Sequence, residues 1–150
     1  MEQGHFSLAE TLLRRSLKHA PHHATTWTNL GLLAIHRSNT AATPWSVRQT
    51  SVASAKRAFE TALRNVPGHT MALHGLGKVA LIKGDPRAAE AFFRHATKAP
   101  RDTLSSVQAL ALLLWRSARP AEARQVVQDH GQRFPAHRAA IQAWAKTHLR

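Results

Sequence analysis

The sequence predicts an all-α protein, an α-solenoid in which antiparallel helix pairs stack one after another. Three observations carry this prediction. Apolar and small residues recur at helical spacing over most of the chain. The same pattern returns after 34 residues, and short turns containing Gly or Pro separate the helical segments. One such helix pair cannot bury its own apolar face, so the copies are expected to share a continuous core.

The clearest unit is the segment 70–100, which reads as two short helices joined by a tight turn. Gly84 can adopt the left-handed conformation that ends a helix, and Asp85-Pro86 supplies an N-cap and a first helical residue. The small Gly77 allows close approach of the two helices, while Phe93 supplies apolar bulk between them. The closing Ala99-Pro100 marks the end of the unit.

Shifting this unit by 34 residues places Leu76 on Leu110 and Ala89 on Ala123, and the reverse shift places Phe93 on Phe59. The first-helix pattern also occurs at 24–34, but 46 residues before its counterpart, which indicates an insertion of 12 residues. The same 46-residue offset places the second-helix pattern on the first segment of the chain. That segment is therefore expected to be the second helix of a repeat whose first helix is missing. The expected helices are 6–19, 24–37, about 51–65, 70–82, 86–98, 104–117, 120–133 and 137–149.

The whole chain, 1–150, is therefore expected to be one domain of about 3.5 repeats with a C-terminal capping helix. Its parts are a partial repeat 4–21, a repeat 24–67 with the insertion at about 38–50, repeats 70–101 and 104–135, and the capping helix 137–149.

The helix-turn-helix unit resembles the tetratricopeptide repeat (TPR), which shares its length and its order of Trp or Leu, Leu, Gly or Ala, then Gly, Ala, Phe, Ala and Pro. The match is strongest at Trp27-Leu30-Gly31 and through 70–100. It is weaker in 104–135, where Ala118 replaces the turn glycine and His130 an alanine. The resemblance implies a right-handed superhelix whose concave groove binds peptides or partner domains, and it implies no enzymatic activity.

In this family the groove is lined by first-helix positions that the core does not use. The amides among them suit a ligand backbone, the lysines a carboxylate, and the apolar residues an amphipathic segment. At any single position an ordinary solvated side chain is the alternative reading. The expected groove residues are Thr28, Asn29, Leu32, His74, Lys78, Gln108, Leu112, Trp115, Gln142 and Lys146.

The insertion contains Trp45, which follows Thr43-Pro44, a sequence typical of a helix N-cap and first position. The second helix of this repeat can therefore begin near Pro44 instead of near residue 51. Trp45 then either packs against the neighbouring unit or lies exposed at the edge of a binding surface.

The charge is strongly basic, with 21 Lys plus Arg against 8 Asp plus Glu and a net charge of +13, which predicts attraction to an anionic partner: nucleic acid, an acidic protein or a membrane surface. The absence of Cys excludes disulfides and thiolate metal sites. No catalytic motif occurs, Pro21 interrupts the alignment of His19, His22 and His23, and neither metal nor cofactor is expected. Without an apolar run of membrane-spanning length, a cytoplasmic protein is the default. Richness in Ala and Arg indicates a GC-rich, bacterial genome.

Three alternatives to peptide binding in the groove remain open. The basic residues gather on second helices, so a convex face can associate with nucleic acid, although no exposed aromatic series accompanies them. The chain can also be a fragment of a larger assembly factor, such as the cytochrome c maturation proteins that carry similar repeats. Finally, the missing first helix leaves the face of Phe6, Leu12 and Leu13 uncovered, which predicts another segment or self-association there.

Overall fold

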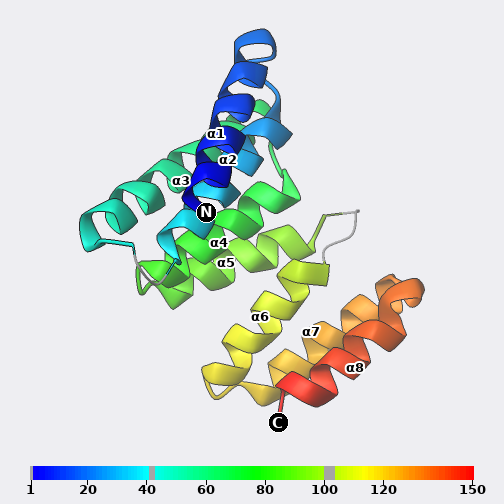
Figure 1. Ribbon diagram of the computed structural model, residues 1–150. Helices are drawn as coiled ribbons and strands as arrows, with labels where there is room; N and C mark the ends of the chain where they lie inside the picture. Colours follow the sequence, from blue (N-terminus) through cyan, green and yellow to red (C-terminus); the bar gives the residue numbers. More distant parts are fainter. Residues whose placement is uncertain (1, 41–42, 100–103) are drawn as a thin grey trace.

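The computed structural model describes residues 2–40, 43–99 and 104–150, and these form eight α-helices and one short 3-10 helix stacked in chain order (Figure 1). The prediction of an all-α helical solenoid is confirmed. The helices are α1 (Glu2–His19), α2 (Ala24–Ser38), α3 (Trp45–Asn65), α4 (Thr70–Ile82), α5 (Pro86–Thr97), α6 (Leu104–Arg116), α7 (Pro120–Arg133), η1 (Pro135–His137) and α8 (Arg138–His148). Pro100 and Arg101, expected to close a repeat, lie outside the described residues, as do Ala41 and Ala42 of the insertion. None of the described helices is long and apolar enough to cross a membrane.

The helices pair as α2 with α3, α4 with α5 and α6 with α7, and each pair packs against the next. Their apolar faces form two core clusters, one over α2, α3 and α4 and the other from the end of α4 to α8. Phe92 packs against both clusters, so the core is continuous along the stack. The last helix, α8, covers the end of the stack with the fully buried Ile141.

The twelve-residue insertion is an elongation of the α2–α3 hairpin, not a loop. In the register of α4 and α5, α2 ends two residues late and α3 begins seven residues early, while the turn between them has six residues instead of three. These differences together make up the twelve residues. The N-cap of α3 is Pro44 rather than Thr43, whose hydroxyl donates instead to the carbonyl oxygen of Arg37 (2.9 Å). The interpretation in which α3 starts near Pro44 is therefore correct.

Phenylalanine rings from second helices pack onto glycines of first helices. Phe59 fills the space beside Gly31 of its own repeat and Gly75 of the next, and Phe93 does the same beside Gly77. A Cβ atom added to any of these glycines would overlap the ring. Both rings are fully buried, so neither can move aside into solvent.

The next repeat solves the same packing problem with different residues. There Ala111 takes the place of the glycine and Val127 the place of the phenylalanine, and both are buried. The larger first-helix residue is thus matched by a smaller second-helix residue, which keeps the filled volume similar.

The turns of the second and third complete repeats share one backbone geometry. In each, the amide three residues past the last helical residue donates back to a carbonyl of the last turn: Asp85 N to Ala80 O (2.9 Å) and Arg119 N to Leu114 O (3.0 Å). The residue before each donor has a positive φ, +76° at Gly84 and +57° at Ala118. Ala118 therefore holds a conformation that disfavours any residue with a Cβ atom.

We expect Gly77→Ala to lower the free energy of unfolding by about 1–3 kcal/mol, because the new methyl group overpacks the Phe93 ring. The same change at the helical Gly131, where an added Cβ meets only the Arg138 side chain at 3.4 Å, is expected to be neutral or to stabilise by up to about 1 kcal/mol. Urea denaturation measures both.

The double variant Gly77→Ala, Phe93→Val, which reproduces the pair of the next repeat, should lower the free energy of unfolding by less than the sum of the two single changes. Strict additivity would contradict this account.

Replacing Ala118 by glycine is expected to raise the free energy of unfolding by about 1 kcal/mol, because the strain of the left-handed conformation disappears. Thermal denaturation measures the effect. Ala121→Gly, in the first turn of α7, is the control, and it should destabilise by about 1 kcal/mol. A loss of stability at position 118 comparable with that at position 121 would disprove the strain.

Candidate functional site

An open hollow of about 420 Å³ lies between α1, α2 and α4, on the side of the stack where first helices are neighbours. We call it the groove. Its walls carry aliphatic and aromatic side chains together with two amides, one imidazole and one ammonium group, and none of the described residues that line it is acidic. The lining residues are Phe6, Leu13, Asn29, Leu32, Leu33, Ile35, His36, Asn39 and Lys78.

Three of the expected groove residues meet in this hollow: Asn29 and Leu32 from α2 and Lys78 from α4. Asn29 and Leu32 lie one turn apart on α2, and Lys78 approaches from the next first helix. Asn29 is exposed, whereas Leu32 and Lys78 are half-buried. The arrangement therefore offers an amide, an aliphatic surface and a positive charge to the same ligand.

Thr28 does not belong to the groove surface, which corrects the expectation. Its side chain is only 2% exposed, and its hydroxyl donates to the carbonyl oxygen of Ala24 (2.9 Å) and lies 3.5 Å from Nδ1 of His69. His69 is the N-cap of α4 and accepts a bond from the amide of Ala72 (3.4 Å). Thr28 thus faces the next repeat, one residue away from the exposed position of Asn29.

His74 is mainly a link between first helices. Its Nδ1 is hydrogen-bonded to Oγ of Ser106 on α6 (3.2 Å), and its ring packs on Phe93 (5.4 Å between centroids). Burial lowers the pKa of His74 from 6.5 to about 4, and the charge of Lys78, one turn along α4, acts in the same direction. The imidazole is therefore neutral at physiological pH, and Lys78 supplies the charge on this face.

The remaining expected residues lie further along the stack and do not line the hollow. Gln108 and Leu112 are half-buried on α6, and Leu112 packs against the second core cluster. Trp115 is also half-buried, and the Arg124 guanidinium of α7 lies over its ring at 5.5 Å from the centroid. Gln142 and Lys146 are exposed on α8.

Several residues that line the groove were not predicted from the sequence. Phe6 and Leu13 of α1 were expected to form an uncovered face, but both are half-buried here, and the Phe6 ring packs on His36 (5.1 Å between centroids). Asn39 was missed although it continues the spacing of Asn29, Leu32 and His36 along α2. Leu12, the third residue of that expected face, is exposed as predicted at 56%, and Leu8, which was not predicted, is 58% exposed.

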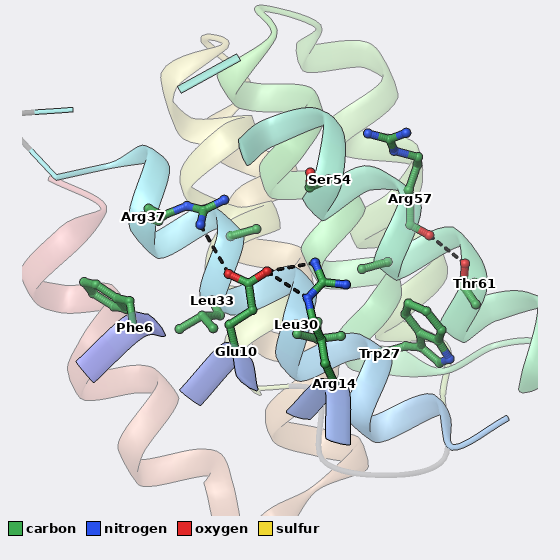
Figure 2. Close-up of a pocket in the computed structure, with 12 residues that line it drawn as sticks. Phe6, Glu10, Arg14, Trp27, Leu30, Leu33, Arg37, Ser54, Arg57 and Thr61 are labelled. Atoms are coloured by element: carbon green, nitrogen blue, oxygen red, sulfur yellow. Dashed lines mark hydrogen bonds and ion pairs between the residues drawn. The ribbon is translucent and has the colours of Figure 1, made fainter. Parts of the chain in front are cut away.

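A second hollow, of about 380 Å³, lies between α1, α2 and α3 (Figure 2). Figure 2 shows the Glu10 carboxylate between two guanidinium groups, with Arg14 at 2.8 Å and Arg37 at 3.3 Å, while Arg57 points away from it. Two of the three arginines in this hollow are thus already paired, and the Arg37–Glu10 pair joins α2 to α1.

Several other basic residues on or beside the second helices are also engaged. Arg94 and Arg119 bind both Glu90 and Glu122 at 2.6–3.2 Å, which ties α5 to α7. Burial raises the pKa of Glu90, but hydrogen bonds from the two arginines outweigh it and the net shift is downward. Arg133 donates to the carbonyl oxygens of Thr97, Lys98 and Ala99 at the end of α5. Much of the basic charge therefore stabilises the stack.

The histidines near Pro21 do not form a metal site within the described part of the chain, where no group of three or more His, Asp or Glu side chains is arranged to hold an ion. His19 and His22 are exposed, and His23 is the N-cap residue of α2, with its Nδ1 2.7 Å from the Thr26 hydroxyl. The 46-residue offset relates His23 to His69, so the two N-caps are counterparts.

Because the pKa of His74 lies at about 4 in the folded chain and 6.5 is its ordinary value, the unfolded chain binds this proton more readily. His74 makes its full contribution to the free energy of unfolding above pH 6.5. As the pH drops from 6.5 towards 4, this contribution falls by on the order of 3 kcal/mol. We expect His74→Asn to flatten this slope in urea denaturation between pH 4 and 7. His95→Asn, at an exposed site, should keep the wild-type slope; equal slopes in all three proteins would contradict the assignment.

Comparison with protein families agrees with the geometry. The family model described as tetratricopeptide repeat matches residues 1–42 and 47–103, and the four residues between the matched segments, 43–46, comprise the end of the α2–α3 turn and the first two residues of α3. No curated protein sequence matches the chain. The repeats of this family generally mediate protein–protein interaction, and its members are typically non-enzymatic scaffolds. The match covers well over half of the sequence, and the chain therefore belongs to the tetratricopeptide repeat family.

Proposed function

We propose that this chain is a non-enzymatic interaction module that binds a segment of a partner protein in the groove between α1, α2 and α4. The observation that carries the proposal is the meeting of Asn29, Leu32 and Lys78 in one hollow of about 420 Å³ with apolar walls. A concave, mostly apolar surface with a few polar groups at defined places is what peptide recognition requires.

Each group in the groove has a defined role in this mechanism. The amides of Asn29 and Asn39 can donate to and accept from the main chain of an extended or helical segment. Phe6, Leu13 and Leu32 take up an aliphatic side chain. The ammonium group of Lys78 pairs with a carboxylate, and the net charge of +13 accelerates encounter with acidic proteins.

The nucleic-acid alternative has less support. Association through a convex face needs unpaired cations in series, whereas Arg14, Arg94 and Arg119 are bound to carboxylates and Arg133 to carbonyl groups. An aromatic series that would stack on bases does not accompany them among the described residues of the second helices.

The groove is tested by site-specific photo-crosslinking and by competition with the captured partner. A photoreactive phenylalanine analogue at Asn29 should crosslink a partner that the same analogue at the exposed Ala91 of α5 does not. Lys78→Glu is expected to weaken binding of that partner at least tenfold, since it reverses the charge inside the groove.

Arg87→Glu is the matched control, because it makes the same change of net charge at an exposed site on the second helix α5. It should leave the affinity within about twofold at 0.15 M salt, where distant charges are screened. Equal losses for the two variants, together with a steep salt dependence and no preference among partner sequences, would favour the nucleic-acid alternative instead.

A further inference from the structure

The elongated α2–α3 hairpin lies next to the shorter α4–α5 hairpin, and the difference in length leaves a step at the turn edge of the stack. The additional seven residues at the start of α3 extend it by about 10 Å. In Figure 1 this part of α3 projects beyond the turn that joins α4 to α5.

A hollow of about 610 Å³ occupies this step. Trp45, the first residue of α3, forms one wall and is 69% exposed. The hollow is also lined by the buried Val52 of α3 and by Ile82, at the end of α4, which is 39% exposed. With 69% of its surface exposed, Trp45 is not buried against the neighbouring unit but lines this hollow. We call this hollow the Trp45 step.

Two cations line the same hollow, Arg48 of α3 and Lys83 just after α4, and none of its described lining residues is acidic. Neither cation has a carboxylate within ion-pair distance among the described residues. The Nε atom of Arg48 is shielded from solvent and finds no acceptor. A donor in this situation costs free energy until an acceptor reaches the group.

We propose that the Trp45 step is a second docking surface, separate from the groove, for an acidic segment of a partner protein that also carries a large apolar side chain. The apolar side chain enters between Trp45 and Ile82, where an exposed tryptophan can act as an anchor. Flanking carboxylates bind Arg48, whose planar guanidinium matches them in geometry, and Lys83.

The charge of the chain argues against a second copy as the occupant. Two copies at +13 repel each other, and the acidic side chains that the structure describes already have partners. Glu10, Glu60, Glu90 and Glu122 are in ion pairs, Asp85 caps α5 and Asp129 accepts from Gln125. A partner of opposite charge is thus the occupant that the step favours.

The side chains that line the Trp45 step favour a peptide over a nucleic acid as its ligand. Single-stranded nucleic acid binds on a series of aromatic side chains along a basic track. The step instead offers one tryptophan together with the aliphatic side chains of Val52 and Ile82. An aliphatic or aromatic side chain with neighbouring carboxylates complements it better than a base with phosphates.

Differential selection tests the proposal with random twelve-residue peptides displayed on phage. Peptides retained by the wild-type chain are counter-selected against a Trp45→Ser, Arg48→Gln variant. The surviving sequences are expected to be rich in Asp and Glu around a Leu, Ile, Phe or Trp. Survivors without acidic residues, or no survivors, would overturn the proposal.

A selected peptide is then synthesised and titrated into the ¹⁵N-labelled chain. The chain has four tryptophans, and the indole N–H signal of Trp45 is expected to shift, while Trp45→Ser weakens the affinity about tenfold or more. Leu12→Ser and Arg87→Gln change an equally exposed apolar residue and an exposed arginine elsewhere, and should leave the affinity within about twofold.

Two further measurements place the peptide. Lys78→Glu should not abolish the shift at Trp45, because the groove is a different surface; its loss would assign the peptide to the groove and contradict the proposal. A twelve-nucleotide oligothymidylate that shifts the Trp45 signal at lower concentration than the peptide would also overturn it. Circular dichroism of Trp45→Ser should match the wild type, since the side chain is exposed.

Discussion

The packing of phenylalanine rings onto glycines sets the distance between helices throughout the first half of the stack. Phe59 lies against Gly31 and Gly75, and Phe93 against Gly77, in space that leaves no room for a Cβ atom. Since these rings are fully buried and interiors are close-packed, a change in one residue requires a compensating change in another. The pair Ala111 and Val127 shows that the chain itself uses this compensation. At these two positions the repeats therefore share the total side-chain volume that is filled more than the type of each residue.

That constraint also explains where the chain departs from regularity. The insertion adds two turns at the far end of the α2–α3 hairpin, beyond the ring of Phe59, and so leaves the packing of the core intact. The hairpin of the neighbouring repeat is shorter and cannot cover the added surface. Trp45 remains exposed for that reason. The groove and the Trp45 step therefore have different origins: one belongs to the stacking of first helices, the other to a mismatch in hairpin length.

The basic composition has two separate consequences. Three of the few carboxylates join helices: Glu10 binds α1 to α2, and Glu90 and Glu122 bind α5 to α7. The cations outnumber the carboxylates, and some of the excess positive charge lines the two proposed binding surfaces. Lys78 lines the groove, and Arg48 and Lys83 line the Trp45 step. Interactions within the chain thus engage the carboxylates whose side chains the structure describes, and the excess of cations biases both surfaces towards acidic ligands.

The sequence alone determined the class of fold, the register and most helix boundaries, because helical periodicity and turn residues are local properties of the chain. It also placed Asn29, Leu32 and Lys78 in the groove. Only the tertiary structure showed that Thr28 faces inward, that His74 binds Ser106 and that Phe6 and Leu13 close one end of the groove. These facts depend on which helix lies opposite each face. The exposure of Trp45 depends on a neighbouring hairpin being shorter, and a pattern along one helix carries no information about the length of the next.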